Sequence, residues 1–300
     1  MSQMSARQSH TEIPARPDLI RLSIGLIGIG TSGPLIALSA MPVPTLIFWR
    51  NLGAAVVTLP FALRHKSERA GLQWAILSGV LLALHFYGFF LAMRMTTVAA
   101  GTALVALQPI FAVLFVKATG GAIPSTVWLG MAVSFFGVVV IAGVDLRLSL
   151  RSFWGDVLAI LSAALAALYM MAGSRARRTL ETSTYTSVCY FVCAMTALPL
   201  SLIAGLQIFH FPLREWWILL GLIVGAQLLG HSMFNSVLKR VSPAIVSLIV
   251  FFEVPVSALL AMWWLGQKPP VGIIPGIVLI LFGCALVVLR TRPSRVMIDQ

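Results

Sequence analysis

The chain has 300 residues, of which 59% are hydrophobic and only 10% are charged, and its mean hydropathy is +0.97. Soluble domains carry about 25% charged residues, so this composition excludes a water-soluble globule. A membrane-spanning helix needs about 20 apolar residues, and ten such helices would occupy about two-thirds of the chain. The composition therefore predicts an all-α membrane protein with short loops and no room for a soluble catalytic domain.

Apolar runs bounded by charged residues, Pro and Gly predict ten transmembrane helices. Residues 1–18 are polar and charged, which is typical of a tail rather than of a cleavable signal peptide. Residues 290–300 form a second short tail. The predicted spans are 19–38, 44–63, 72–93, 97–116, 124–143, 154–173, 184–204, 216–236, 242–264 and 271–289.

The distribution of Lys and Arg among the loops indicates how the chain is oriented in the membrane, and these residues account for the net charge of +12. With the N-terminus inside, 15 Lys and Arg residues fall in inside segments and 5 in outside segments, while Arg50 lies within a span. The bias predicts a multi-pass protein with both termini cytoplasmic, and the membrane that we expect is a bacterial inner (plasma) membrane. No region combines clustered basic residues with exposed aromatic residues, so nucleic acid is not an expected partner.

The chain repeats itself at an offset of 146 residues without gaps. Several of the superposed identities are Gly and Pro, whose backbone roles other residues do not reproduce. The offset moves each helix five places along the order, and because five is odd the two halves cross the bilayer in opposite senses. The pairs include Gly79 with Gly225, His85 with His231, Arg94 with Arg240, Pro109 with Pro255, Gly130 with Gly276, and Gly137 with Gly283.

The sequence thus predicts two inverted five-helix repeats, over residues 19–143 and 154–289. Inverted repeats are the architecture of secondary transporters, whose substrate site lies near the bilayer midplane between the halves. In such proteins access alternates as one half moves against the other. An inert bundle produced by gene duplication is the alternative to this interpretation.

A family resemblance accompanies the repeat. Residues 96–143 contain LQPIFAVLF and residues 240–289 contain FEVPVSALLAMWWLGQ, each with a mid-helix Pro and a last helix marked by spaced Gly. This pattern resembles the EamA domain of the drug/metabolite transporter superfamily over nearly the whole chain. The resemblance implies export of amino acids and related metabolites without a cofactor. The acid that often follows the Leu-Gly corner in the family is replaced here by Gln267 and by Gly121, so its role does not transfer.

Ionisable groups at membrane depth are costly and are functional candidates by default. We interpret Glu253 as the only acid inside the spans; it lies halfway along 242–264, two residues before Pro255. A proline frees a backbone carbonyl one turn earlier, so this helix can open toward a cavity. Glu253 could therefore exchange a proton or contact a substrate amine, or it could serve only as a hydrogen bond between helices.

The other candidates are neutral or basic. Gln108 and Pro109 are the first-half counterpart of this region, and Gln108 could bind substrate or join helices. His231 shares a helix face with Gln227 and Asn235, at four residues on either side. His85 and His231 could relay protons near neutral pH, or could simply bond to neighbouring helices.

Arg50 lies about seven residues into the second span. Its guanidinium could bind a substrate carboxylate or phosphate through paired donors, or it could extend to the outer interface. The resemblance places a basic residue near the start of this helix in many EamA members. Tyr87 belongs to a group of aromatic residues in the spans that could line a cavity for an apolar substrate.

The chain has no phosphate-binding Gly-x-x-x-x-Gly-Lys loop and no His-Glu-x-x-His metal site, so neither ATP nor a metal is expected to take part. We therefore predict a secondary exporter of a small amphipathic metabolite, in the first place an amino acid, and not an enzyme. Protons are a candidate coupling ion, and the oligomeric state stays open. The alternatives are efflux of drug-like cations and a non-transporting sensor or assembly protein on the same fold.

Overall fold

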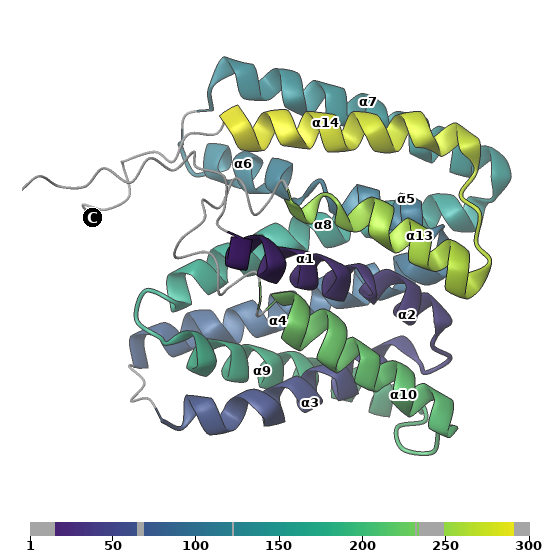
Figure 1. Cartoon of the computed structure of the whole chain (residues 1–300). Coiled ribbons are helices and arrows are strands. Elements are labelled where there is room, and N and C mark those ends of the chain that lie inside the picture. Colours follow the sequence, from purple (N-terminus) through teal and green to yellow (C-terminus); the bar gives the residue numbers. More distant parts are fainter. Residues whose placement is uncertain (1–15, 65–68, 122, 232, 234–248, 291–300) are drawn as a thin grey trace, which may run out of the picture.

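The computed structural model describes residues 16–64, 69–121, 123–231, 233 and 249–290. All regular secondary structure in these ranges is helical. Nine helical stretches among the described residues are long and apolar enough to cross a membrane. They pack side by side into one bundle, with α7 and α14 at one edge and α3 and α9 at the other (Figure 1).

Two of the first five spans are interrupted. In the first span, Pro34 lacks the N–H that would bond to the carbonyl of Gly30, and the helix breaks at Thr31. In the fourth span, the break precedes Gln108 and Pro109. The elements are α1 Arg16–Gly30, α2 Ser32–Leu38, α3 Val43–Ala62, α4 Arg69–Met95, α5 Val98–Val105, α6 Gln108–Ala118 and α7 Ser125–Leu148.

The second half begins directly after Ser149, which caps the next helix through its side chain. Its eighth span starts as an α-helix and continues as a wider π-helix, a form that is rare and frequently found at functional sites. The predicted span 242–264 lies partly outside the described residues. The elements are α8 Leu150–Ala176, α9 Thr182–Ile203, α10 Leu213–Gly221, π-helix η1 Leu222–His231, α13 Glu253–Leu265, 3₁₀-helix η2 Val271–Ile273 and α14 Ile274–Arg290.

The helix contacts follow the predicted inverted repeat. The fifth and tenth spans, α7 and α14, pack against each other, and so do the second and seventh, α3 and α9. An offset of five helices maps each of these pairs onto itself. The same operation maps the contact of α4 with α8 onto that of η1 with α1, and both contacts are present. The fold is therefore a ten-helix bundle of two inverted five-helix repeats.

Glycines allow α7 and α14 to approach closely. A Cβ on Gly130 would stand 2.7 Å from the carbonyl oxygen of Gly283, and one on Gly137 would stand 2.6 Å from that of Gly276. Gly130 and Gly137 are the repeat counterparts of Gly276 and Gly283, so each glycine meets the counterpart of the other. This reciprocal arrangement is the mark of an interface related by a two-fold axis.

Candidate functional site

A buried arginine lies at the contact between the two halves. Arg50 of α3 is 1% exposed, so it does not extend to an interface as one interpretation of the sequence allowed. Its Nε donates to Oε1 of Gln227 on η1 at 2.6 Å, and its Nη1 donates to Ser32 Oγ of α2 at 3.4 Å. The guanidinium also lies over the ring of Phe86, with Cζ 4.5 Å from the ring centroid.

Both polar atoms of the Gln227 amide form hydrogen bonds. While Oε1 accepts from Arg50, Nε2 donates to Oδ1 of Asn51 at 3.2 Å, and the Asn51 amide donates to the carbonyl of Ile47. Gln227 and Asn51 are both fully buried. Residues of the first half (Ser32, Arg50 and Asn51) and one of the second half (Gln227) thus form a single polar network, which we call the Arg50 cluster.

Glu253 lies at the first turn of α13 and is half-buried. Its carboxyl interacts electrostatically with Arg50, although no direct ion pair joins these two described residues. One turn along the same face, Ser257 donates to the carbonyl of Gly30 at 2.8 Å. That carbonyl is the one freed by Pro34, so the broken first helix is bonded to the helix that carries Glu253.

His85 is bonded inside the bundle. Its Nδ1 lies 2.9 Å from the carbonyl oxygen and 2.8 Å from Oγ of Ser162 on α8, and Ser162 Oγ donates to the carbonyl of His85 at 3.0 Å. The ring stacks on Phe89, with 5.9 Å between centroids. This geometry fits a hydrogen bond between α4 and α8, which was the simpler of the two roles considered.

The remaining predicted residues are scattered. Gln108 contacts the sulfur of Met170 on α8, and Tyr87 of α4 lines a cavity that contains no residue of the Arg50 cluster. Pro109 follows the break between α5 and α6, and Pro255 is in the first turn of α13. The side chain of His231 and all of Asn235 lie outside the described residues.

The interpretation of Glu253 as the only acid inside the spans is wrong. Asp156 lies within the predicted span 154–173. In addition, α7 ends later than expected and includes Asp145, and α10 begins earlier than expected and includes Glu215. Glu215 accepts from Ser39 Oγ at 2.7 Å and from the N–H of Ala40 at 2.9 Å. Thr96 Oγ1 donates to Asp145 Oδ2 at 2.7 Å. These acids lie near helix ends, where a sliding-window average of hydropathy locates the boundary of a span least accurately.

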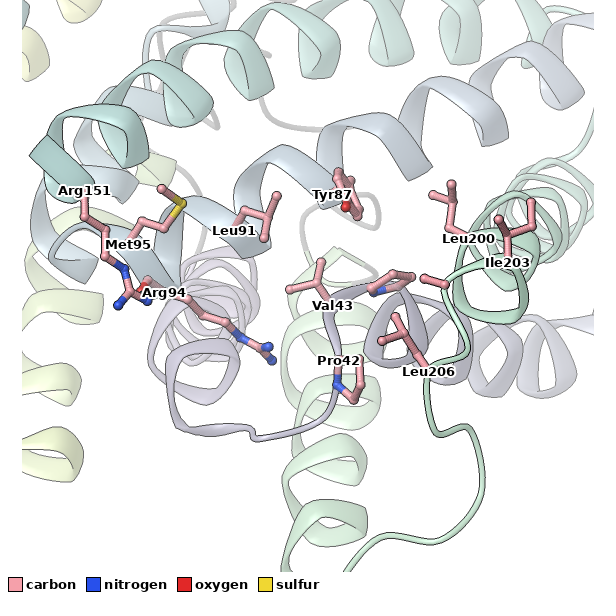
Figure 2. Close-up of a pocket in the computed structure, with 12 residues that line it drawn as sticks. Pro42, Val43, Tyr87, Leu91, Arg94, Met95, Arg151, Leu200, Ile203 and Leu206 are labelled. Atoms are coloured by element: carbon pink, nitrogen blue, oxygen red, sulfur yellow. The ribbon is translucent and has the colours of Figure 1, made fainter.

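A cavity lies at the end of the bundle that contains the turn 39–42, and we call this end the 39–42 end. Its volume is about 760 Å³, and it is bounded by the start of α3 and the ends of α4 and α9. Figure 2 shows Arg94 and Arg151 together at one end of it and Leu200 and Ile203 at the other. Of the predicted site residues, Tyr87 alone lines this cavity.

The described residues include no group of three His, Cys, Asp or Glu side chains that could hold a metal ion. What the Arg50 cluster offers instead is a buried cation whose hydrogen bonds go to neutral groups. Such a group can bind a carboxylate or phosphate through its remaining N–H donors. Its position between inverted halves is where secondary transporters bind substrate.

Comparisons with known proteins agree with this architecture, which is that of an integral, multi-pass membrane transporter. The model of the EamA-like transporter family matches residues 20–143 and again residues 153–289. The chain belongs to the EamA-like transporter family.

Similar proteins include a curated relative and a solved structure. An uncharacterized transporter of Archaeoglobus fulgidus is 26% identical over 234 residues, which cover 75% of this chain and 80% of that protein. A protein of known crystal structure is 20% identical and has a TM-score of 0.62, covering 91% of this chain and 98% of that one. The structural likeness supports the fold, and neither relative identifies a substrate.

Proposed function

We propose that this transporter exports a small amphipathic metabolite, an amino acid or a related compound, by alternating access. The observation that supports the proposal is the Arg50 cluster, in which a fully buried guanidinium bridges the two halves and forms no direct ion pair with any described carboxylate. A buried cation is costly, and it is retained where its charge has a use. A substrate carboxylate would supply a negative charge that is bonded directly to the guanidinium.

The proposed binding step follows from the donors of Arg50. A guanidinium has five N–H groups, and the bonds to Gln227 and Ser32 use Nε and Nη1, which leaves donors on the outer nitrogen atoms. When one half moves against the other, the bond to Gln227 is the one that must stretch, because its partners belong to different halves. An entering carboxylate would then bind to Arg50 by two parallel hydrogen bonds, while Phe86 supports the apolar part of the substrate.

A release screen tests the proposal. Cells that overproduce the chain should accumulate one or more amino acids in the medium, and cells producing Arg50→Gln should not. Arg50→Lys keeps the charge and loses the planar pair of donors, so it should retain part of the export. Arg214→Gln, an exposed arginine away from the cluster, is the matched control. Equal release by the wild type, Arg50→Gln and empty-vector cells, with all variants present in the membrane, would contradict the proposal.

Coupling to protons is a separate proposal that rests on Glu253, since its carboxyl interacts with Arg50. Purified protein in liposomes should export faster when a pH gradient is imposed, and Glu253→Gln should remove that acceleration. Facilitated downhill export is the other mechanism. Equal rates with and without the gradient would favour it and dismiss antiport.

The same experiments distinguish two alternative functions from metabolite export. Efflux of drug-like cations would use Glu253 as the counter-charge, and would appear as resistance to cationic compounds that Glu253→Gln loses and Arg50→Gln keeps. A non-transporting sensor or assembly protein would change neither metabolite release nor resistance.

We also propose the location and orientation of the chain: the inner membrane of a bacterium, with both termini cytoplasmic and the 39–42 end outside. The orientation is supported by the count of Lys and Arg residues, which is 15 in inside segments against 5 in outside segments. A reporter enzyme that is active only outside the inner membrane should be inactive when fused after residue 300 and active when inserted after residue 206.

A further inference from the structure

The cavity at the 39–42 end carries two arginines that the proposed transport site does not use. Arg94 Nη2 donates to the carbonyl of Met41 at 2.7 Å, and its Nε donates to that of Ile36 at 3.4 Å. Arg151 Nη2 in turn donates to the carbonyl of Arg94 at 3.0 Å. These bonds hold both side chains in place at the cavity wall (Figure 2).

The charge of this pair is not neutralised locally. All three of these bonds go to backbone carbonyls, which carry no net charge, and none of the described residues that line the cavity is acidic. Glu215 interacts electrostatically with Arg94, but its Oε2 already accepts from Ser39 and Ala40, and its Oε1 faces Arg214 at 3.7 Å. Among the described residues, no ion pair involves Arg94 or Arg151.

The rest of the wall is largely apolar and runs along one face of α4. Tyr87, Leu91 and Arg94 follow each other at spacings of four and three residues, which places them on the same side of the helix. They span about 10 Å along the helix axis. Opposite them, Val43 and the end of α9 supply aliphatic side chains. The cavity is thus cationic at one end and apolar along its length.

We propose that this cavity binds an amphipathic organic anion, with a carboxylate or phosphate head on Arg94 and Arg151 and an apolar body along Leu91 and Tyr87 toward the end of α9. Its volume of about 760 Å³ suits a ligand of that kind. The site is separate from the Arg50 cluster, since none of the cluster residues lines it. The proposal does not depend on what the transporter exports.

Two sources share this chemistry: an anionic phospholipid of the bilayer and a water-soluble organic acid. The experiment has one arm for each, with purified full-length protein in discs of phosphatidylcholine. The first probe is phosphatidylglycerol, read as retained lipid by native mass spectrometry. The second is labelled 4-phenylbutyrate, read by equilibrium dialysis. Saturable binding of the first probe assigns the site to lipid, and binding of the second assigns it to a soluble anion.

Arg151→Gln is the decisive variant, because Arg151 is exposed and makes one bond to the backbone, so the fold should tolerate its loss. Because Arg151 supplies one of the two charged donors for the head group, binding of the retained probe should weaken about tenfold or more. Ala204→Phe, at an exposed cavity position, should block binding without changing charge. Arg214→Gln, at the same end but outside the cavity, should bind as the wild type does.

The proposal fails if neither probe binds saturably. It also fails if Arg151→Gln and Ala204→Phe both bind with wild-type affinity, or if Arg214→Gln weakens binding as much as Arg151→Gln. The last result would show a general attraction of anions to the basic end of the bundle rather than a site.

Discussion

Ser134 of α7 donates a hydrogen bond of 3.3 Å to the carbonyl oxygen of Ile280 on α14, 146 residues later in the chain. The separation equals the offset of the internal repeat, so each residue is bonded to its own counterpart in the other half. A contact between counterparts lies on the axis that relates them. With the reciprocal glycines on either side, this bond places the pseudo-two-fold axis between α7 and α14.

Close packing at this axis predicts the effect of one added methyl group. Gly137→Ala should lower the midpoint of thermal unfolding, because the new Cβ would stand 2.6 Å from the carbonyl oxygen of Gly276. Overpacking of this kind costs about 1–3 kcal/mol. Gly143→Ala, in the same helix with nothing within 4 Å, should leave the midpoint unchanged or raise it. Since Ala has the higher helix propensity, a similar loss in both variants would show that contact with α14 is not the cause.

The bond between the halves at Gln227 predicts a second loss of stability. Gln227→Leu leaves the buried Nε of Arg50 without its acceptor, which should cost about 1–3 kcal/mol in the free energy of unfolding. The readout is the unfolding midpoint in a single detergent. Gln207→Leu, an exposed position, is the control and should have little effect. If Gln227→Leu is as stable as the wild type, the network does not hold the halves together.

The contact of His85 with Ser162 predicts a smaller effect. Ser162→Ala removes the hydroxyl from the pair, and the loss of one buried hydrogen bond should cost about 0.5–1.5 kcal/mol. Ser174→Ala on the same helix is exposed and should cost little. A Ser162→Ala protein that unfolds at the wild-type midpoint would remove the structural role assigned to His85.

Two buried acids at the 39–42 end should respond in opposite ways. Within the part of the chain that the structure describes, neither buried oxygen of Asp156 accepts a hydrogen bond, and the nearby carboxyl of Asp145 repels its charge. Asp156→Asn, which has the same shape and no charge, should therefore unfold at the same or a higher temperature. Asp145→Ala should unfold at a lower temperature, because Thr96 loses its acceptor. A lower midpoint for Asp156→Asn would show that its carboxylate contributes to stability.

The fold could be predicted almost entirely from the sequence, because hydropathy locates spans and the repeat fixes their mutual orientation. The family, the helical class and the inverted repeats are confirmed. Boundaries were less certain where polar residues occur within a helix. The helix that contains Asp145 continues to Leu148, beyond the predicted end at 143, since the carboxylate has a hydroxyl partner inside the protein.

The candidate site was only partly predictable. Arg50 and Gln227 were among the predicted residues, and the structure joins them. Ser32, Asn51 and Ser257 were missed, because small polar residues are common in spans and their partners come from distant helices. Two features of the sequence could have indicated the role of Ser257. It lies one turn after Glu253, and Pro34 leaves a backbone carbonyl free in the first span. The roles of Glu253, Gln108 and the two prolines stay predictions.

The seam between α7 and α14 has a consequence for how such a molecule can arise. Because Gly130 meets Gly283, and Gly137 meets Gly276, each half presents a surface that is complementary to itself. A free five-helix half could therefore associate with a second copy that had inserted into the bilayer the other way round. Joining the two copies in one chain makes that opposed pairing permanent. Every molecule then contains one half in each orientation.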